Sequence, residues 1–474
     1  MPNHTLAVLF LLPVLVACSA TSHDPHNEQN HEQVLFSELY SWSPALQETH
    51  AQTVDTQSTS DHGMGPSSAD ITSSVLSPTQ AQSLALQQSP AIRAILASQG
   101  IADAAYRQAT LINNPGLSAS ALRPEDGGRW QTEFAINLGV LDWLTQGLRK
   151  QQASAEFRAA QSRVLDALSA ELSSVSSTYF AAVAARQLDT QYQQAAETAR
   201  LNAELARQLN EAGNLSELDW LRYDSEFARR QQAAQQSRFH ADEALAALKL
   251  KLGMGFNSEL VIPQVLPDTE NEMLDINRLK TLSQNEDEFR QLLASAWEKR
   301  PDARLLRDSA TMLQKRLGLQ AQRFGMTEAG VGLVTERDSD GSNASGFEFD
   351  LSIPVFDQGQ TTDAYVQAQL EQLAADKQTL ELVIENQLGT SITRLLSLTS
   401  QIMQLRDEDI PRHQQMLDLA LQEYNFMLTG AFDLLSVKQD QNENMIRYIG
   451  LLQQYWVEYA RLMQFSANQE HHHD

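Results

Sequence analysis

The chain has 474 residues, of which 35 are basic and 60 acidic, and its formal net charge is −25. A surface this acidic repels phosphate backbones, so nucleic acid is not an expected partner. The single cysteine, Cys18, excludes both an internal disulfide framework and a metal site built from cysteines.

Residues 1–17 have the features of a signal peptide. The apolar run Leu6–Val16 is too short to span a bilayer comfortably and lies where a secretory core region lies. The small residues before Cys18 resemble a bacterial lipobox, in which Cys18 would become the acylated first residue. Ser19, rather than Asp, follows it, which in Gram-negative lipoproteins implies export to the outer membrane. The first five residues carry no Lys or Arg, and a cleaved signal without lipid remains the alternative.

Residues 18–75 are predicted to form a lipidated tether. They are polar, rich in Ser, Thr, Gln and His, and show little periodicity, which is typical of extended or disordered chain. His23, His26 and His31 could bind a transition metal, but no ordered scaffold fixes their geometry. We interpret them, and the His-rich tail at 469–474, as solvated segments, and we predict no metal site and no cofactor.

A first structural repeat is predicted over residues 76–287. It begins with a helix from Leu76 to about Leu111, because Ser77 and Pro78 have the pattern of an N-cap followed by a first-turn proline. Asn113 to Gly116 breaks this helix. A strand pair then fills 116–142, with strands at 117–123 and 131–141. In the second strand, apolar residues at 134, 136, 138 and 140 share the face opposite Glu133.

A very long helix follows, from about Leu144 to Leu209. At 1.5 Å per residue it would reach roughly 100 Å, which no globular core requires, so it must pack along other helices. Gly213 is placed to end it. A return helix runs from Leu215 to about Gly253, and residues 256–287 form an irregular excursion at the equator of the molecule.

The second repeat, residues 288–468, has the same order of elements. A helix runs from Pro301 to Arg323, and a strand pair fills 327–356. The strand Gly346–Phe356 has one apolar face, and its other face carries Glu348, Asp350 and Ser352. Such an alternation over about ten residues suits a transmembrane β-barrel. A half-buried strand of a soluble sheet is the alternative for one strand alone.

A helix from Thr361 to Leu428 with a kink at Pro411, a tip at Gly430 and a last helix to about Asn468 complete this repeat. Pro90 and Pro301 are 211 residues apart, and Gly213 and Gly430 are 217 apart, which indicates an internal duplication. The predicted fold class is mainly α with a transmembrane β-barrel: a long α-helical barrel plus four strands per chain.

The order and spacing of these elements resemble the TolC-like outer membrane efflux family over about Leu76 to Arg461. The resemblance rests on Leu76-Ser77 through Gln88-Ser89-Pro90, Ala212-Gly213-x-x-Ser216-x-x-Asp219, Arg300-Pro301-Asp302, Ile353-Pro354-Val355-Phe356-Asp357-x-Gly359, and Gly430 leading to Leu434-Leu435. It implies a homotrimer with a twelve-stranded barrel in the Gram-negative outer membrane and a helical tunnel in the periplasm. The lipobox is similar to that of the lipoprotein branch serving resistance-nodulation-division tripartite pumps.

In that family the tips of the tunnel meet the helical hairpin of a periplasmic adaptor protein. The matching positions are Gly213, Leu215, Ser216, Leu218, Gly430, Phe432, Asp433 and Leu435. Some members carry aspartates six and nine residues after the second tip glycine, where this chain has Ser436 and Gln439, with Asp433 out of phase. In the first repeat, Asp219 lies six residues after the tip glycine, Gly213. We predict that Asp219, Glu133, Glu348 and Asp350 are acids of the entrance or the lumen.

The predicted function is a passive duct for drugs, solvents or metal ions, driven by an inner membrane transporter. The chain has neither a G-x-x-x-x-G-K loop nor a G-x-S-x-G elbow, and we do not predict an enzyme. One alternative is the outlet of a type I protein secretion system. Another is a periplasmic adaptor lipoprotein, which would have one hairpin flanked by halves of a small β-domain. A structural coiled-coil lipoprotein is contradicted by the strands.

Overall fold

The computed structural model describes residues 75–123, 125, 129–268, 276–323, 329–353, 355–356 and 358–463. The predicted signal peptide, Cys18, the three histidines at 23, 26 and 31, nearly all of the tether and the His-rich tail lie outside these residues.

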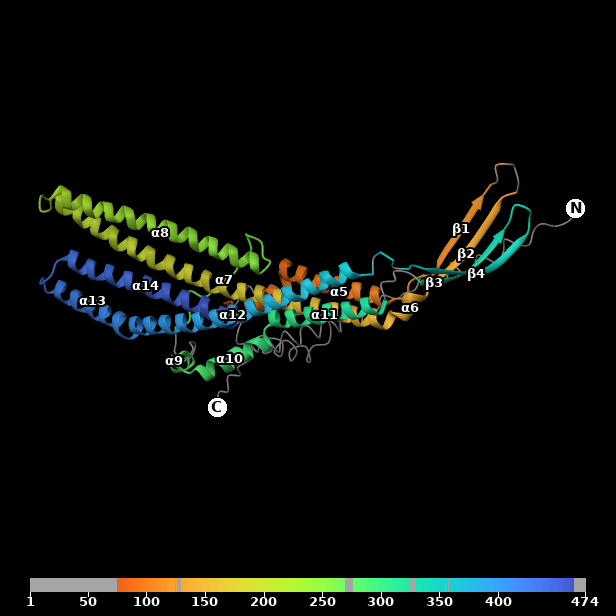
Figure 1. Cartoon of the computed structure of the whole chain (residues 1–474). Coiled ribbons are helices and arrows are strands. Elements are labelled where there is room, and N and C mark those ends of the chain that lie inside the picture. The colour runs from red at the N-terminus through yellow and green to blue at the C-terminus, as the bar shows by residue number, and fades with distance from the viewer. Residues whose placement is uncertain are drawn as a thin grey trace, which may run out of the picture.

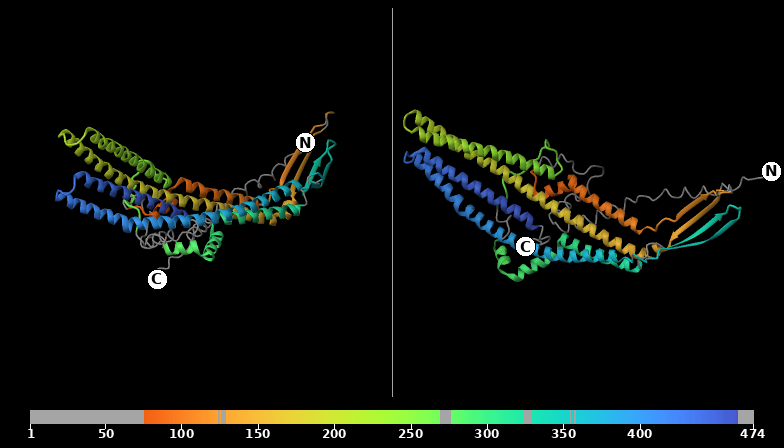
Figure 2. Two further views of the ribbon diagram at one scale, coloured as in Figure 1. Left: turned by 60° about the vertical axis from the view of Figure 1, so that its left-hand side comes forward. Right: turned by 45° about the horizontal axis from the view of Figure 1, so that its top comes forward.

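The molecule is long and narrow, with a β-sheet at one end and two helical hairpins at the other (Figures 1 and 2). The first half of the chain contains α4 (Pro78–Gln88), α5 (Pro90–Thr110), β1 (Gly116–Leu122), β2 (Gln131–Gly139), α6 (Val140–Leu144), α7 (Gln146–Glu211) and α8 (Glu217–Lys251). The second half contains α9 (Ile276–Gln284), α10 (Glu286–Lys299), α11 (Pro301–Arg323), β3 (Ala329–Arg337), β4 (Asn343–Leu351), α12 (Gln360–Gln404), a π-helix (Leu405–Asp409), α13 (Ile410–Asn425) and α14 (Ala431–Met463).

The chain enters the fold through a capping box. Ser77 Oγ accepts a hydrogen bond from the Gln80 backbone N–H at 3.2 Å, and Gln80 Oε1 accepts one from the Ser77 N–H at 2.9 Å. The predicted N-cap is therefore present. The single helix predicted to Leu111 is instead two helices, because Ser89 is extended and Pro90 cannot donate the backbone bond that would continue α4.

The long helices match their predicted extents closely. α7 has 66 residues, a length of roughly 100 Å, and its buried side chains are largely Ala, Ser and Val, which allow close helix packing. The kink predicted at Pro411 is a π-helical turn at Leu405–Asp409, with Pro411 in the first turn of α13. The wider turn accommodates a residue that has no N–H to donate.

The four strands form one antiparallel sheet in the order β1-β2-β3-β4, so the pair of each repeat joins the other through β2 and β3. Two predicted strand ends are wrong. β2 ends at Gly139, because Leu141 is buried and Val140–Leu144 turns into the short helix α6. β4 ends at Leu351, three residues before Pro354, which has no N–H for a strand ladder.

An aromatic cluster at mid-length is the centre of the hydrophobic core. Phe180 of α7 stacks on Trp456 of α14 with ring centroids 5.1 Å apart. Tyr179 Oη donates to the Leu76 carbonyl at 2.8 Å, and Trp456 Nε1 donates to the Pro267 carbonyl at 2.7 Å. Burial raises the pKa of Tyr179 to about 12. The cluster thus fixes both the chain entry and the described part of the predicted excursion.

We expect Gly253→Ala to lower the free energy of unfolding by roughly 1–3 kcal/mol. Gly253 ends α8 with φ +75°, and a Cβ there would lie 2.5 Å from the Gln88 carbonyl oxygen. Gly100→Ala in α5 is the control, because its Cβ would meet nothing within 4 Å and alanine favours a helix by up to about 1 kcal/mol. Thermal unfolding followed by circular dichroism tests this, and equal melting temperatures for the two variants would contradict it.

Candidate functional site

The first hairpin tip, between α7 and α8, has the geometry of a Schellman motif. Gly213 has φ +77°, and the Asn214 N–H donates to the Leu209 carbonyl at 2.8 Å. Ser216 then caps α8 by accepting a bond from the Asp219 N–H at 3.1 Å. The sequence therefore identified both the end of α7 and the start of α8 correctly at this tip.

The second tip, between α13 and α14, has the same backbone path but a different residue at its turn. Met427 has φ 59°, and the Leu428 N–H donates to the Glu423 carbonyl at 2.9 Å. Gly430 occupies the capping position that Ser216 holds in the first tip, and its N–H donates to Asp433 Oδ2 at 3.2 Å. The pairing of Gly213 with Gly430 is therefore wrong by three residues.

In the corrected register the two tips correspond at a separation of 214 residues, so that Gly213 matches Met427 and Asp219 matches Asp433. Asp433, placed out of phase in the sequence comparison, is thus the counterpart of Asp219. Neither carboxylate is free. Asp219 binds Ser216 Oγ at 2.7 Å and Arg222 at 3.0 Å, and Asp433 caps α14.

The tips expose large apolar side chains, three of which the sequence analysis missed. Phe426, Met427 and Leu428 are exposed, Met427 by 94%, and Leu218 of the first tip is 60% exposed. An apolar run directly before the turn residues Thr429 and Gly430 was the available signal. Exposed apolar side chains gathered at the end of a helical hairpin are typical of an interaction surface.

Ion pairs near the first tip lower the pKa of two acids of α7, Glu197 and Glu204. Arg207 binds both Glu204 and Glu211, at 2.7 and 2.6 Å. Its hydrogen bond lowers the pKa of Glu204 to about 2. In the same way the Arg200 side chain holds the pKa of Glu197 below its usual value. This face of the helix therefore presents paired charges.

The two hairpins touch each other close to their tips. Tyr223 of α8 stacks on Phe432 of α14 with ring centroids 4.7 Å apart. Arg230 binds Glu443 at 2.5 Å, and Gln439 lies 3.5 Å from Glu226. Phe432, predicted as a tip contact, is therefore half-buried between the hairpins, whereas Leu435 is half-buried on α14.

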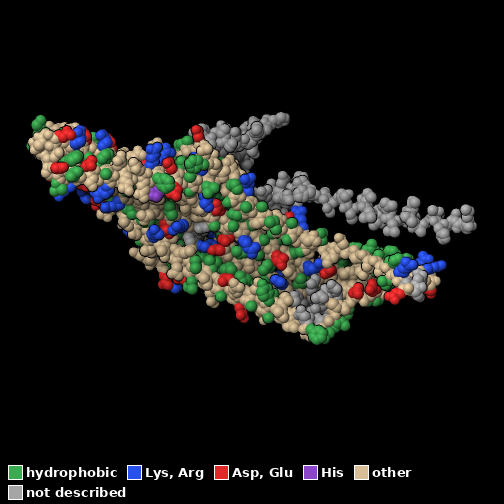
Figure 3. Space-filling model, turned by 90° about the horizontal axis from the view of Figure 1, so that it is seen from above, with side chains coloured by type: hydrophobic (Ala, Val, Ile, Leu, Met, Phe, Trp, Pro, Cys, Tyr) green, Lys and Arg blue, Asp and Glu red, His purple; other side chains and the backbone are tan. Residues whose placement is uncertain are grey.

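The strand end of the molecule has two chemically different faces (Figure 3). Leu333 pairs with Ile136 on one side and Phe347 on the other, and Phe347 and Phe349 are each 77% exposed. Glu133 lies on the opposite face and pairs in register with Glu336, which accepts a bond from Gln131. Glu336 is an acid of this face that the sequence analysis did not single out, although it lies in a predicted strand.

Glu348 and Asp350 of β4 share the face of Glu133, because they pair with Gly332 and Gly330 of β3. The structure thus brings the strand acids together at one end and the tip residues together at the other. Ile353 and Val355, predicted on the apolar face, follow the strand but are also exposed.

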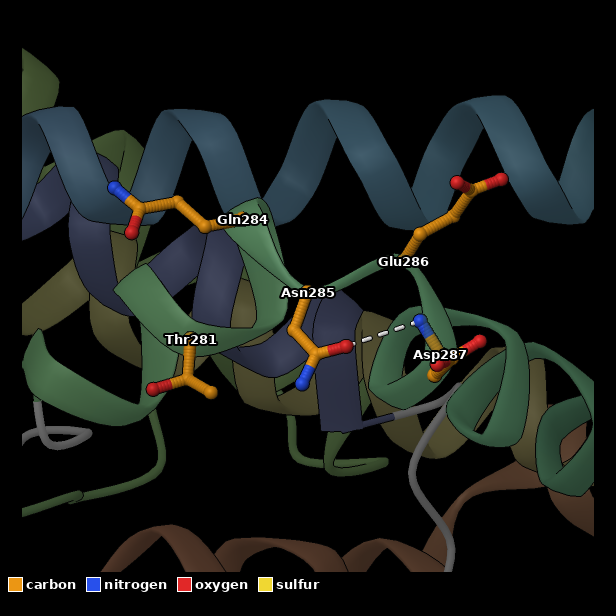
Figure 4. Close-up of a pocket in the computed structure, with 5 residues that line it drawn as sticks. All are labelled: Thr281, Gln284, Asn285, Glu286 and Asp287. Atoms are coloured by element: carbon orange, nitrogen blue, oxygen red, sulfur yellow. Dashed lines mark hydrogen bonds between the residues drawn. The ribbon is translucent and has the colours of Figure 1, made fainter.

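A recess of about 420 Å³ lies at the start of α10 (Figure 4). Asn285 Oδ1 accepts bonds from the backbone N–H groups of Asp287 and Glu288. The acids of the first turn and the Asn285 amide are therefore used to begin the helix.

No protein-family model and no curated protein matches the sequence. Solved structures do match. The CmeC outer membrane channel of Campylobacter jejuni superposes with a TM-score of 0.66 at 14% identity, over 84% of this chain and 87% of its own. The chain has the fold of the TolC-like outer membrane channels.

Two further outer membrane proteins have the same fold. The outer membrane protein VceC of Vibrio cholerae gives a TM-score of 0.63 at 14% identity, over 83% of this chain and 97% of its own. The open state of the MtrE channel of Neisseria gonorrhoeae gives 0.58 at 14% identity, over 82% and 88%. The described chain has two hairpins and two strand pairs, the features that separate it from an adaptor with one hairpin.

Within the described residues, no helix has a stretch long and apolar enough to cross a membrane.

We expect substitutions at the turn residues of the two tips to change local stability in opposite directions. Gly213→Ala should lower local stability by roughly 1 kcal/mol, because nothing lies within 4 Å of a Cβ there and only the positive φ is costly. Met427→Gly should remove a similar strain and raise local stability. Hydrogen exchange of the amides in the last turns of α7 and α13 measures both, and changes of the same sign would contradict the assignment.

Proposed function

We propose that the protein is a trimeric outer membrane channel of a tripartite efflux system, a passive duct from the periplasm to the exterior. The observation that supports this most strongly is the sheet, whose one face is apolar and exposed while the other carries Glu133, Glu336, Glu348 and Asp350. An outer apolar band around a polar interior is the pattern of a barrel in a membrane.

The edges of the sheet support assembly from several chains. Among the described residues β1 and β4 each pair on one side only, so each presents a row of unpaired backbone groups. In a membrane every such group needs a partner, and a closed barrel supplies one. Three copies joined edge to edge would close a barrel of about twelve strands with lipid outside and water inside.

The tips support docking of a periplasmic adaptor. Leu218, Phe426, Met427 and Leu428 are exposed at the end opposite to the sheet, where a partner from the inner membrane would approach. The adaptor would link this channel to an inner membrane transporter, which would supply energy and select the small toxic compounds for export. Acylated Cys18 would add a lipid anchor to that of the barrel.

We expect the purified full-length protein to have the mass of a trimer in detergent and to form small, cation-selective channels in planar bilayers. Glu133→Gln combined with Glu336→Gln should lower the ratio of potassium to chloride permeability, because these carboxylates lie on the proposed luminal face. Glu286→Gln with Glu288→Gln on α10 removes the same charge far from the strands and should not change the ratio. A monomer with no conductance would overturn the proposed function.

A further inference from the structure

The apolar face of the sheet carries charge at one end only. Among the described strand residues and those directly beside them, the charged positions on this face are Arg337, the last residue of β3, and Arg123, which follows β1. The four strand acids described above all lie on the opposite face. In a chain with a net charge of −25, the charges of this outward face are therefore both positive.

Trp130 lies beside these arginines on the same face. It directly precedes β2, is 56% exposed, and continues the alternation of Thr132 and Phe134. The guanidinium carbon of Arg123 lies 6.0 Å from the centre of its ring. Arg337 pairs with Thr132 on the other side of β2. The ring thus holds one arginine at the surface, and the second lies only one strand away.

Both guanidinium groups are free to bind a ligand. The two side chains are exposed, and neither has an ion-pair partner among the described residues. The acids of the adjacent β3–β4 turn accept bonds within the turn, Asp338 from the Ser339 hydroxyl at 3.1 Å and Asp340 from the Ser342 N–H at 2.7 Å. Within the described part of the chain no ion pair joins Glu125 of the other turn to either arginine.

The level of these residues along the strands matches the boundary of a membrane. β2 has nine residues, which extend for about 30 Å and cover about 23 Å of depth at a tilt of about 40°. The apolar band of a membrane barrel is about 25 Å tall. Trp130 therefore lies at one edge of the band, and Trp143, 64% exposed in α6, follows the other end of β2. Tryptophan is enriched at both membrane interfaces.

Arginine at the edge of the apolar band requires an anionic partner. Within hydrocarbon a charged side chain is costly, whereas at the boundary its long stem lies along apolar surface and its head reaches the lipid headgroups. A guanidinium group binds phosphate oxygens through two parallel hydrogen bonds. The turns that carry the arginines lie at the end opposite to the helical tips, where Figure 3 shows basic side chains gathered.

We propose that Arg123, Trp130 and Arg337 form a binding site for a phosphate-bearing lipid in the exterior leaflet of the membrane. The two arginines bind phosphate oxygens, Trp130 lies at the level of the headgroup, and the acyl chains follow the apolar face beside Phe134 and Leu333. The inference rests on the proposed channel function, because the barrel gives this face its lipid and the tips give the turns their exterior position.

Diphosphoryl lipid A is the probe, and native mass spectrometry of the full-length protein in detergent counts the bound molecules. We expect saturable binding with one site per chain, tighter than that of phosphatidylcholine. Arg123→Gln combined with Arg337→Gln should weaken this binding about tenfold or more, the effect of losing about 1.4 kcal/mol. Trp130→Ala leaves both charges and should also weaken it, because the ring positions Arg123. An equal concentration of inorganic phosphate should not displace the lipid.

The matched control is Arg93→Gln on α5 combined with Arg238→Gln on α8, which removes the same charge from exposed positions away from the sheet and should bind as the unaltered protein does. Circular dichroism and the mass in detergent establish that each variant is folded and assembled.

Binding that is no tighter than that of phosphatidylcholine, that is unchanged in the sheet variants, that weakens equally in the control, or that inorganic phosphate displaces would overturn the site. The same preparations are tested in planar bilayers. A conducting trimer without arginine-dependent lipid binding would overturn this inference alone, and arginine-dependent binding without conductance would overturn the channel and leave the lipid site.

Discussion

The unpaired edges of the sheet are the constraint on which the rest of the structure depends. Four strands from one chain satisfy each other's backbone groups only inside the sheet, and β1 and β4 keep one open side each among the described residues. Their apolar face is also exposed, so a single chain in water is left with both unsatisfied hydrogen bonds and uncovered hydrophobic area. Closure with other copies in a lipid environment, as proposed, would resolve both problems together. The helices would then follow the same ring, which is consistent with their arrangement side by side in a curved layer (Figure 2).

The packing between the helices changes in character along the molecule. At mid-length, Tyr179, Phe180 and Trp456 form an aromatic core that also binds the chain entry at Leu76 and the segment at Pro267. Toward the tips the same junction contains Thr198, Asn202 and Asn442, ion pairs such as Arg230 with Glu443, and a single stacked pair, Tyr223 with Phe432. Apolar and aromatic contacts are lost when surfaces separate, whereas polar side chains can exchange partners with water at little net cost. The hairpins are therefore held firmly at mid-length and more weakly at the tips.

Periodicity in the sequence predicted the helices, the strands and the duplication, because a long helix and an exposed strand each impose a simple repeat on their apolar residues. The errors arose where local signals compete. Gly430 looked like the turn residue of the second tip, yet a glycine also serves as an N-cap, and tertiary context places Met427 at the positive φ. The end of β2 depended on the burial of Leu141, which local sequence does not show. The stacking of Tyr223 on Phe432 could not have been found, because the two rings come from hairpins that are distant in sequence.

In the corrected register, the two halves of the chain have long helices of equal length but different residues at their tips. The stretch Gln360–Asn425, through α12, the π-turn and α13, has 66 residues, the same number as α7. Equivalent positions are 211 residues apart at the prolines and 214 apart at the tips. The three extra residues of the second half therefore lie before its long helix begins. Because the long helices are equal in residue number, the two tips reach the same level (Figure 1). Their surfaces differ, however, since Gly213 and Asn214 of the first tip correspond to Met427 and Leu428 of the second. A partner that contacts both tips would therefore meet a small polar turn beside a large apolar one. The two tips are not equivalent for binding, although their backbones follow the same path.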